Sequence, residues 1–403
     1  MLIVKKFGGS SVANKERIFN VARRCIEDYK QGNDVIVVLS AMGDTTDNLL
    51  EMARDINPNA SKRELDMLLT TGEQVSVALM AMAMSAYDVP AISLNAFQVR
   101  MHSTAIYGNA RFKRIDSERI RHELAERKIV IVTGFQAVNK YEDYATLGRG
   151  GSDTTAVALA AALHADKCEI YTDVDGVYTA DPRVVQNARK IDEIMYDEML
   201  ELATAGAKVL HNRSVEMAKK YGVELVVRSS LTSEEGTVVK EGVKRMEEML
   251  ITGVAADKNT ARISMIGVSD TPGIAFKIFN TLAKYNVNVD IILQSVGREG
   301  KKDISFTVSE DDLDEALKIL GENKEILTIQ EITYNTNVAK VSIVGAGMLS
   351  NPGVAAKLFE SLFNANININ MISTSEIRIT VLIDRKDTDK AVNAIHDGFK
   401  LNV

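Results

Sequence analysis

Cysteine is scarce in this chain of 403 residues, because only Cys25 and Cys168 occur. Two cysteines are too few for a disulfide scaffold, and no CxxC pair offers the spacing that is typical of a zinc site. Scarce, unpaired thiols are usual in reducing compartments. We therefore expect a cytoplasmic protein.

Long hydrophobic runs are also missing. The longest stretch without a charged residue covers the 16 positions 341–356, whereas a helix that spans a bilayer needs about 20 apolar residues. The chain begins directly with an apolar run at residues 1–4, so no secretory leader is expected. Basic residues are scattered and the net charge is −7, which does not fit a nucleic-acid-binding protein. We expect neither a membrane nor a nucleic acid as a partner.

The length suits two or three domains, and the last third of the chain contains a repeat. Residues 272–290 (PGIAFKIFNTLAKYNVNVD) align without a gap with residues 352–370 (PGVAAKLFESLFNANININ), at an offset of 80 positions. Apolar residues at helical spacing predict a helix in each copy, and the β-branched runs around it predict strands. Each copy is therefore predicted to form a βαββα unit.

The closing strands of the two units set the expected domain boundaries. Residues 326–333 predict a closing strand for the first unit, and we expect residues 249–256 to supply the one that the second unit lacks. The expected domains are 1–231, a charged linker 232–248, residues 249–334 with that strand and a first unit from about 260, and a second unit 335–403 completed by 249–256.

Residues 1 to about 240 alternate apolar runs with amphipathic stretches. Strand-like runs occur at 2–4, 35–39, 91–94, 129–133, 169–172 and 224–227, and helix-like stretches such as 14–30, 61–84 and 117–127 lie between them. This alternation predicts an α/β domain with a mostly parallel sheet that helices cover on both faces. Ligands of such sheets bind beyond the carboxyl ends of the strands.

Two glycine-rich turns suit the binding of anions. KFGGSS (residues 6–11) places Lys6 before two glycines, and GRGGSD (148–153) places Arg149 beside two more. Bare backbone amides at a helix start approach phosphates closely, and a basic side chain adds a full charge. Neither turn has the GxxxxGK[ST] or GxGxxG pattern. A structural role for either turn, and a simple helix cap at Asp153, remain alternatives; the pair favours phosphoryl transfer.

A third segment, YTDVDGVYTADPR (residues 171–183), is rich in acidic residues. Asp173, Asp175 and Asp181 could face magnesium or a ribose. Asp175 and Gly176 could instead form a tight turn between two short strands. The spacing is not that of a calcium-binding EF-hand loop.

These motifs, in this order, resemble those of the amino acid kinase family, and most closely those of the aspartate kinases. The resemblance rests on KFGGSSV, SAM (40–42), TTGEQVS (70–76), GFQA (134–137), GRGGSDTTA and YTDVDGVYTADPR, and the repeat resembles tandem ACT domains. It implies a carbamate-kinase-like three-layer sandwich followed by two ferredoxin-like βαββαβ ACT domains. It also implies transfer of the γ-phosphoryl group of ATP, with Mg²⁺, to the β-carboxylate of L-aspartate. The product would be 4-phospho-L-aspartate, at the head of lysine, threonine and methionine biosynthesis.

The resemblance also implies roles for the matching residues. Lys6 and Asp153 are expected to be catalytic. The aspartate site is expected to contain Ser40, Thr46, Glu73, Arg149, Gly150, Gly151 and Ser152. The nucleotide site is expected to contain Lys6, Gly8, Gly9, Ser10, Thr172, Asp173, Tyr178, Asp181, Arg183, Lys208 and Val209. No metal site made by the protein alone is expected.

Three of these positions have plainer interpretations. Glu73 could merely favour the start of a helix, and Lys208 could be a solvated lysine on a helix. We expect His211 to be structural, because the carboxylate of aspartate is already ionised and needs no general base.

For the ACT pair, the resemblance implies feedback inhibition by lysine, threonine or both, and a homodimer formed through these domains. A tetramer, or pairing with a short regulatory subunit, is left open, as is a pair used only for dimerisation. The expected effector residues are Asp270, Ala275, Asn288, Asp290 and Gln294 in the first unit, and Ser350, Asn370 and Thr374 in the second. Asn370 stands where the first unit has Asp290, which predicts non-equivalent half-sites.

Two other functions compete with this interpretation. One is a kinase of the same fold that acts on glutamate or a nucleoside monophosphate, against which Glu73 and the ACT pair argue. The other is a catalytically silent amino-acid sensor, against which Lys6, Arg149 and Asp153 argue.

Overall fold

The computed structural model describes residues 1–207, 209–243, 250–349 and 351–402. The chain forms two compact units. The first comprises residues 1–178, 190–204 and 208–245, and the second comprises residues 179–189, 205–207 and 246–403.

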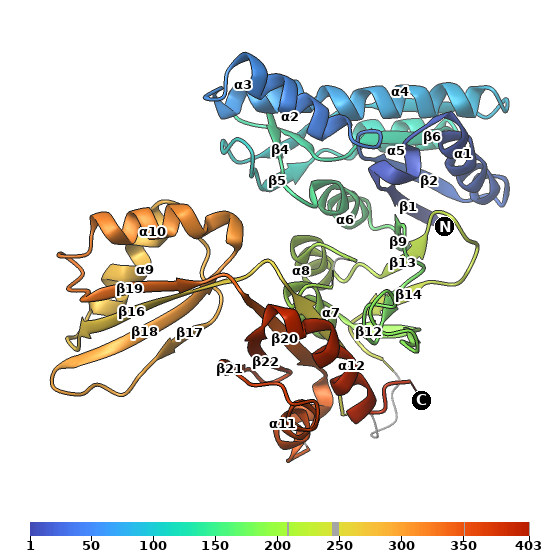
Figure 1. The fold of residues 1–403 in the computed structure, drawn as a ribbon. Coiled ribbons are helices and arrows are strands. Elements are labelled where there is room, and N and C mark those ends of the chain that lie inside the picture. The colour runs from blue at the N-terminus through green and yellow to red at the C-terminus, as the bar shows by residue number, and fades with distance from the viewer. Residues whose placement is uncertain (208, 244–249, 350, 403) are drawn as a thin grey trace. The chain divides into compact units, whose positions relative to one another are not determined.

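An eight-stranded sheet forms the centre of the first unit (Figure 1), in the order β12-β14-β13-β9-β1-β2-β6-β3. Its strands are β1 (Leu2–Phe7), β2 (Asp34–Leu39), β3 (Ala91–Leu94), β6 (Ile129–Thr133), β9 (Lys167–Thr172), β12 (Glu193–Met195), β13 (Leu225–Ser229) and β14 (Thr237–Lys240). Neighbouring strands are parallel except for β13 and β14, which are antiparallel. The prediction of a mostly parallel sheet is confirmed.

Helices cover both faces of this sheet. On one face, α1 (Lys15–Lys30) and α4 (Thr71–Ser85) bury Val21 and Met80 against Phe7 and Val37. On the other face, α6 (Gly151–Leu163) contacts β1, β2 and β9, α5 (Glu118–Ala125) contacts β6, and α8 (Asn212–Tyr221) packs against α6. β-branched residues fill the central strands because both faces are buried. The three layers predicted from the sequence are present.

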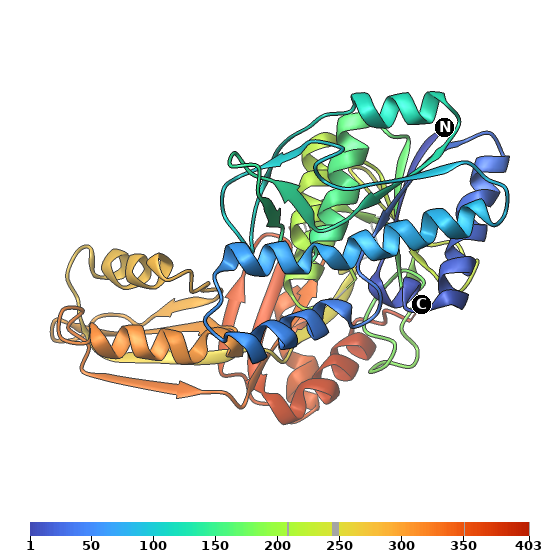
Figure 2. The same ribbon diagram turned by 90° about the horizontal axis from the view of Figure 1, so that it is seen from above.

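The helical stretch expected at 61–84 is divided into α3 (Lys62–Leu69) and α4, which follow almost directly on one another (Figure 2). Together, residues 62–85 are apolar and long enough to cross a membrane by length and composition, but half of their most apolar 18-residue window is buried inside the protein. The inward face of α4 belongs to the main core. A buried core helix can have the same length and apolar composition as a membrane-spanning helix. The stretch 62–85 is therefore only weak evidence for a membrane span.

The first unit also contains a small four-stranded sheet, in the order β5-β4-β7-β8. Its strands are β4 (Met101–Ser103), β5 (Phe112–Ile115), β7 (Gln136–Val138) and β8 (Tyr144–Thr146). β7 and β8 form an antiparallel hairpin. The loop after β8 leads into α6, so this hairpin positions the second glycine-rich turn. Further elements of the unit are α2 (Thr45–Ile56), α7 (Tyr196–Thr204), β10 (Val177–Tyr178) and β11 (Lys190–Ile191).

The segment 232–248, expected to be a linker, contains a strand. Its residues Thr237–Lys240 form β14, which pairs with both β12 and β13. The sequence prediction was wrong here because the surrounding charges hide a short alternation, in which Thr237 and Val239 are buried while Val238 and Lys240 are less so. Alternating burial of this kind is the pattern of a strand.

The second unit contains two similar repeats. The first repeat consists of β16 (Ala261–Ser269), α9 (Ile274–Lys284), β17 (Ile292–Gln294), β18 (Lys301–Val308), α10 (Leu313–Glu322) and β19 (Glu331–Asn335), with sheet order β17-β18-β16-β19. The second repeat consists of β20 (Val338–Val344), α11 (Val354–Asn364), β21 (Met371–Thr374), β22 (Arg378–Asp384) and α12 (Thr388–Gly398). Its sheet order is β15-β20-β22-β21, so β15 (Gly253–Asp257) occupies the place that β19 has in the first repeat. Both repeats have the predicted ferredoxin-like topology.

The closing strand of the first repeat begins at Glu331, later than the expected start at residue 326. Leu327 and Ile329 are buried, but they lie in the turn after α10, where Thr328 has a φ of 52°. Apolar residues fill the core there from a turn, so the sequence pattern alone placed the strand too early.

Candidate active site

Four neighbouring strand ends bring several of the predicted site residues to one edge of the main sheet. β1 ends just before Gly8, β2 just before Ser40, β6 just before Gly134, and β9 ends at Thr172. These strands are adjacent and parallel in the order β9-β1-β2-β6. Their carboxyl ends therefore meet at the edge where sheets of this type bind ligands.

Lys6 points from β1 toward α6 and pairs with Asp153 in the first turn of that helix. The distance between Lys6 Nζ and Asp153 Oδ1 is 2.6 Å, and each side chain is 12% exposed. Because side chains alternate along a strand, the preceding Lys5 points to the opposite face. It is buried there beside Asp28 of α1 and Glu169 of β9. Only one of the two lysines is thus available to a ligand.

The turn after β1 lies close to the turn after β2. A Cβ atom on Gly9 would lie 2.7 Å from the carbonyl oxygen of Ala41, and the backbone N–H of Gly43 donates to the carbonyl of Gly9 at 3.0 Å. Gly9 is therefore required for this approach. Gly8 has more space, since a Cβ atom there would lie 3.6 Å from Lys6 Nζ. Ser10 follows as an exposed residue.

Two serines meet at this edge of the sheet. The hydroxyl of Ser40 donates to the hydroxyl of Ser152, with 3.0 Å between the oxygens. A Cβ atom on Gly134 would lie 2.6 Å from Ser152 Oγ, so the glycine of the GFQA motif leaves the room that this contact needs. Thr46 lies nearby in sequence, half-buried in the first turn of α2.

Glu73 is a buried carboxylate next to the turn after β2. One of its oxygens accepts the backbone N–H of Ala41 at 3.2 Å, while Oε2 has no hydrogen-bond partner in the described structure. Burial raises the pKa of Glu73 to about 7. A carboxylate that only favoured the start of α4 would gain nothing from burial, so this geometry favours a group that receives a cation.

The second glycine-rich turn presents Arg149 as an exposed side chain. Gly150 has a φ of 69°, and a Cβ atom there would lie 2.2 Å from the ring of His211. Gly150 is the N-cap of α6, and no side chain makes a capping hydrogen bond. The interpretation of Asp153 as a simple helix cap is therefore wrong, because its carboxylate pairs with Lys6 instead.

Two residues that the sequence analysis did not consider hold the same loop. Asp66 on α3 accepts the backbone N–H and the hydroxyl of Thr146, both at 2.8 Å. Arg213 on α8 donates to the carbonyl oxygen of Leu147 at 2.6 Å. Both contacts join positions more than 60 residues apart, so no local sequence signal indicates them.

The predicted nucleotide residues of the first unit follow β9. Thr172 Oγ1 accepts the N–H of Val174 at 2.9 Å, and Asp173 is exposed. The hydroxyl of Tyr178 donates to Asp175 at 2.9 Å, and burial raises the pKa of Tyr178 to about 12. Asp175 is thus engaged by a neighbour, which leaves Asp173 as the freer carboxylate of this segment.

The structure does not test the remaining nucleotide predictions. Asp181 and Arg183 belong to the second unit, where they form an ion pair at 2.8 Å. Val209 is half-buried in the first unit, and Lys208 lies outside the described residues. These assignments stay predictions.

A preformed metal centre is not apparent among the residues that the structure describes. No group of three or more His, Cys, Asp or Glu side chains there could hold an ion. Magnesium in phosphoryl-transfer sites is commonly held by one or two carboxylates together with substrate phosphates. The described residues therefore fit a magnesium ion only if it enters with a nucleotide.

The expected effector residues of the first repeat lie around its helix start and its edge strand. Asp270 follows β16 and pairs with Lys302 at 2.9 Å, and Ala275 lies in the first turn of α9. Asn288 and Asp290 precede β17, and Gln294 ends that strand.

The corresponding positions of the second repeat have different partners. Asp290 pairs with Lys340 of β20 at 2.6 Å, whereas Asn370 donates to Asp384 at 3.2 Å. Thr374 is exposed at the end of β21, and Ser350 lies outside the described residues. The two repeats thus differ in charge at this position, and the non-equivalence of the half-sites stays a prediction.

Comparison with known proteins agrees with this architecture. Residues 1–229 match the amino acid kinase family, and residues 263–323 and 341–399 match the ACT domain. The chain is 51% identical over 401 residues to an aspartokinase of Bacillus sp. (strain MGA3), covering 100% of this chain and 98% of the relative. It is also 51% identical over 405 residues to the aspartokinase of Corynebacterium glutamicum, covering 99% and 96% of the two chains.

A solved structure extends the likeness to the whole fold. The crystal structure of E. coli aspartokinase III in complex with aspartate and ADP has a TM-score of 0.84 to this chain, with 27% identity and 99% of each chain covered. The chain therefore belongs to the amino acid kinase family, among the aspartokinases that carry ACT domains.

Proposed function

We propose that this chain transfers the γ-phosphoryl group of ATP to the β-carboxylate of L-aspartate and forms 4-phospho-L-aspartate. The observation that carries the proposal is the Lys6–Asp153 pair at 2.6 Å, next to the Gly8–Gly9 turn and the start of α6. Phosphoryl transfer needs positioned positive charge and aligned reactants more than covalent help from the protein. A lysine, bare amides and a helix N-terminus at one edge supply such charge.

Lys6 stabilises the γ-phosphoryl group during its transfer, together with the backbone amides of Gly8 and Gly9. Asp153 keeps the ammonium group of Lys6 at the site through their ion pair. When ATP binds, the ammonium group of Lys6 can reach the γ-phosphate over a short distance, because Nζ already lies near Gly8. The charge that develops on the equatorial oxygens is thereby neutralised.

Aspartate is held at both of its ends. Arg149 pairs with the α-carboxylate, since a guanidinium group binds a carboxylate through two hydrogen bonds, and Gly150, Gly151 and Ser152 line this end. Glu73 receives the ammonium group, and Ser40 and Thr46 position the reacting carboxylate. That carboxylate is already a nucleophile at neutral pH, so His211 is not needed as a base.

The nucleotide lies over the ends of β1 and β9. Ser10, Thr172, Asp173 and Tyr178 contact it from the first unit. Mg²⁺ accompanies the phosphates of ATP and supplies charge neutralisation when bound.

The two ACT domains bind lysine, threonine or both and lower the activity. Asp270, Asn288 and Gln294 suit an amino acid in the first repeat, because a carboxylate can accept its ammonium group and the amide side chains can bind its carboxylate. Asn370 and Thr374 suit a second, uncharged half-site. Inhibition follows if the effector binds better to a conformation that binds aspartate poorly.

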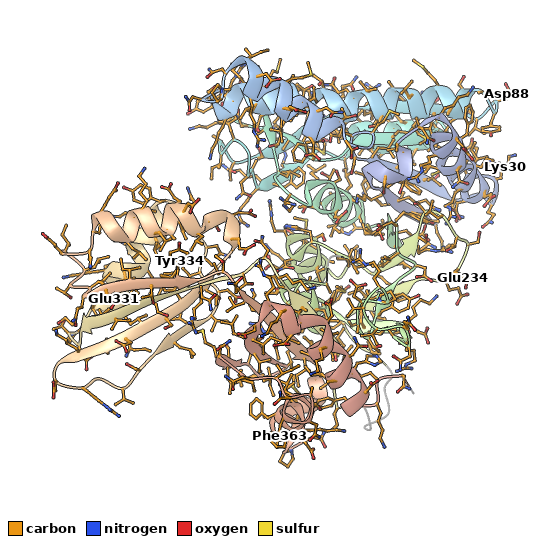
Figure 3. The ribbon with its side chains drawn as sticks, in the orientation of Figure 1. Lys30, Asp88, Glu234, Glu331, Tyr334 and Phe363 are labelled. Atoms are coloured by element: carbon orange, nitrogen blue, oxygen red, sulfur yellow. The ribbon has the colours of Figure 1, made fainter. Side chains whose placement is uncertain are left out.

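A homodimer through the ACT domains explains the aromatic side chains on their surfaces. Phe363 on α11 is 81% exposed and Tyr334 on β19 is 60% exposed (Figure 3). Exposed aromatic residues are enriched at protein interfaces. A tetramer or a complex with a short regulatory subunit is compatible with the same surfaces.

Cys25 and Cys168 are both free and buried, which fits an enzyme of the cytoplasm.

An assay with ATP, Mg²⁺ and hydroxylamine tests the proposal. The acyl phosphate formed from aspartate reacts with hydroxylamine to give a hydroxamate, which is measured as its coloured ferric complex, and glutamate is expected to give none or far less. Release of ADP from ATP measures the turnover of uridine monophosphate, which is expected to be absent. Turnover of glutamate or the nucleotide in preference to aspartate would favour another kinase of this fold. Binding of lysine without turnover of any substrate would favour a silent sensor.

A further inference from the structure

Asp66 is a buried carboxylate that makes three hydrogen bonds to one region of the first unit. Its side chain is 2% exposed. Oδ1 accepts the hydroxyl of Thr146 at 2.8 Å, and Oδ2 accepts the backbone N–H groups of Thr146 and Gly108 at 2.8 and 2.9 Å. All of these partners are neutral donors, so the carboxylate acts here as a holder of backbone geometry.

Another hydrogen bond links the C-terminal end of α3 to the hairpin formed by β7 and β8. The side-chain amide of Gln136 donates to the carbonyl oxygen of Thr70 at 2.6 Å. Gln136 on β7 lies directly opposite Thr146 on β8. The last turn of α3 and its C-cap residue therefore hold both strands of the hairpin at its open end.

The positions of these bonds along the chain connect the two ends of the aspartate site. Asp66 precedes Glu73 by seven residues, about two helical turns, and α3 leads almost directly into α4. Thr146 precedes Arg149 by three residues. Asp66 therefore joins the segment that carries the acceptor for the ammonium group, Glu73, to the segment that carries the donor to the α-carboxylate, Arg149.

Arg213 supports the same loop through different atoms. Its guanidinium group donates to the carbonyl oxygens of Leu147 at 2.6 Å and Ala110 at 2.8 Å, and to Asn109 Oδ1 at 3.2 Å. Residues 146 and 147 are thus fixed by an anionic acceptor from α3 and a cationic donor from α8. A loop held in this way loses little conformational entropy when aspartate binds.

We propose that Asp66 is a positioning residue for aspartate, which sets the spacing between Glu73 and Arg149 by holding Thr146. This inference rests on the proposed function and adds to it a residue that does not touch the substrate. The hydrogen-bond geometry of Asp66 carries the role, and its negative charge does not.

The chain offers a rescue variant and a matched control. In D66N, the amide oxygen can accept both backbone N–H groups and the amide nitrogen can donate to the Thr146 hydroxyl, so the geometry is kept. In D66A, two backbone N–H groups lose their acceptor. Asp143 is the control, because it also links α3 to the β7–β8 hairpin, through Arg63 at 2.8 Å, but at the turn end of the hairpin.

Steady-state kinetics with aspartate and ATP varied separately test the proposal. We expect D66A to raise the KM for aspartate about 10- to 100-fold, since small displacements in a binding site have effects of this size. The KM for ATP should change less than about threefold, and D66N and D143A should stay near the wild type. A folded D66A with an unchanged KM for aspartate, equal changes in both KM values, or a D66N that behaves like D66A would overturn the proposal.

Two further measurements keep the test valid if D66A does not fold. T146V removes only the hydroxyl bond, and we expect it to raise the KM for aspartate about 3- to 10-fold, the effect of losing one hydrogen bond; no change would refute the proposal. When T146V is added to R149A, the KM for aspartate should not rise further, because Thr146 acts through Arg149. If the effects of the two substitutions on this KM were fully additive, the proposal would be contradicted. A wild-type enzyme inactive on aspartate would refute the proposed function itself, before any variant is compared.

Discussion

Lys6 Nζ lies 2.6 Å from Asp153 Oδ1, although 147 positions separate the two residues in the chain. β1 and the first turn of α6 meet where the parallel strands end, and the pleat of β1 directs Lys6 toward the helix. The ion pair fixes the ammonium group of Lys6 at the edge of the sheet. The neighbouring Lys5, on the opposite face, forms a buried ion pair with Glu169 instead.

Lys6→Met should lower the turnover rate strongly without unfolding the protein. Removal of one preorganised charge that stabilises a transition state lowers kcat about 10²- to 10³-fold. Hydroxamate formation measures the loss, and calorimetric titration with lysine should show that effector binding is retained. A rate within tenfold of the wild type would rule out the role given to Lys6.

Lys5→Met should affect stability first. Lys5 and Glu169 are each 2% exposed and lie 3.1 Å apart, and Lys5 helps to hold the pKa of Glu169 at about 2, although burial alone would raise it. Loss of one partner from a buried ion pair costs about 3–5 kcal/mol. Urea unfolding at pH 7 should show this decrease for Lys5→Met and a much smaller one for Lys6→Met. Equal losses in the two variants would contradict the assignment.

Aspartate binding should weaken as the pH falls through about 7, the pKa to which burial raises Glu73. A protonated Glu73 cannot pair with the ammonium group of the substrate. The KM for aspartate should therefore rise between pH 8 and pH 6 while the KM for ATP stays nearly constant. Glu73→Gln should remove this pH dependence and bind aspartate weakly throughout.

The raised pKa of Glu73 also predicts that the protein becomes less stable as the pH rises, whereas its binding of aspartate becomes stronger. The pKa of Glu73 is raised from 4.5 to about 7 in the folded protein, so the folded state binds this proton more tightly than the unfolded state does. Its ionisation costs stability as the pH rises through that window. Glu73→Gln should therefore unfold at a higher temperature than the wild type at pH 8. A lower melting temperature of Glu73→Gln at pH 8 would show that the ionised carboxylate of Glu73 does not destabilise the folded protein.

Gly150→Ala should impair aspartate binding, because the new Cβ atom would meet the ring of His211 and the residue has a φ of 69°. A shift of the Arg149 loop should raise the KM for aspartate about tenfold or more. Gly32→Ala is the matched control, since Gly32 has a φ of 89° but no atom within 4 Å of the added Cβ. It should cost about 1 kcal/mol of stability and leave the kinetics unchanged. Equal kinetics for both variants would show that the loop tolerates displacement.

Asp270→Asn should weaken feedback inhibition and leave the uninhibited rate intact. The carboxylate pairs with Lys302 and is the proposed acceptor for the ammonium group of the effector. The effector concentration for half-inhibition should rise about tenfold, within the usual range of allosteric coupling. Asp314→Asn, an exposed residue on α10, is the control. The proposed effector site would be refuted if both variants were inhibited like the wild type.

Much of the architecture could be predicted because it has a local cause. The alternation of apolar runs and amphipathic stretches indicated the three layers, and the repeat at an offset of 80 positions indicated two ferredoxin-like units. Segment 232–248 was misjudged because four residues of alternating burial do not stand out among many charges. The strand after residue 326 was placed too early because Leu327 and Ile329 serve the core from a turn.

The candidate site divides in the same way. Glycine-rich turns and their basic neighbours are contiguous in the chain, so Lys6, Arg149 and Asp153 could be selected from motifs. Asp66 and Arg213 could not, because their importance arises from partners 80 and 66 residues away. Nothing in their own neighbourhoods distinguishes them from other charged helix residues.

The sequence by itself determined the order of strands and helices, the doubled regulatory unit and the chemistry available at each turn, since periodicity and residue type are local properties. Only the tertiary structure decided that Lys5 is buried on the opposite face of the sheet, which carboxylate is buried with a raised pKa, and which side chains fix the loop that carries Arg149. These depend on which face of a strand is covered and on how much water is excluded, and packing between distant segments sets both.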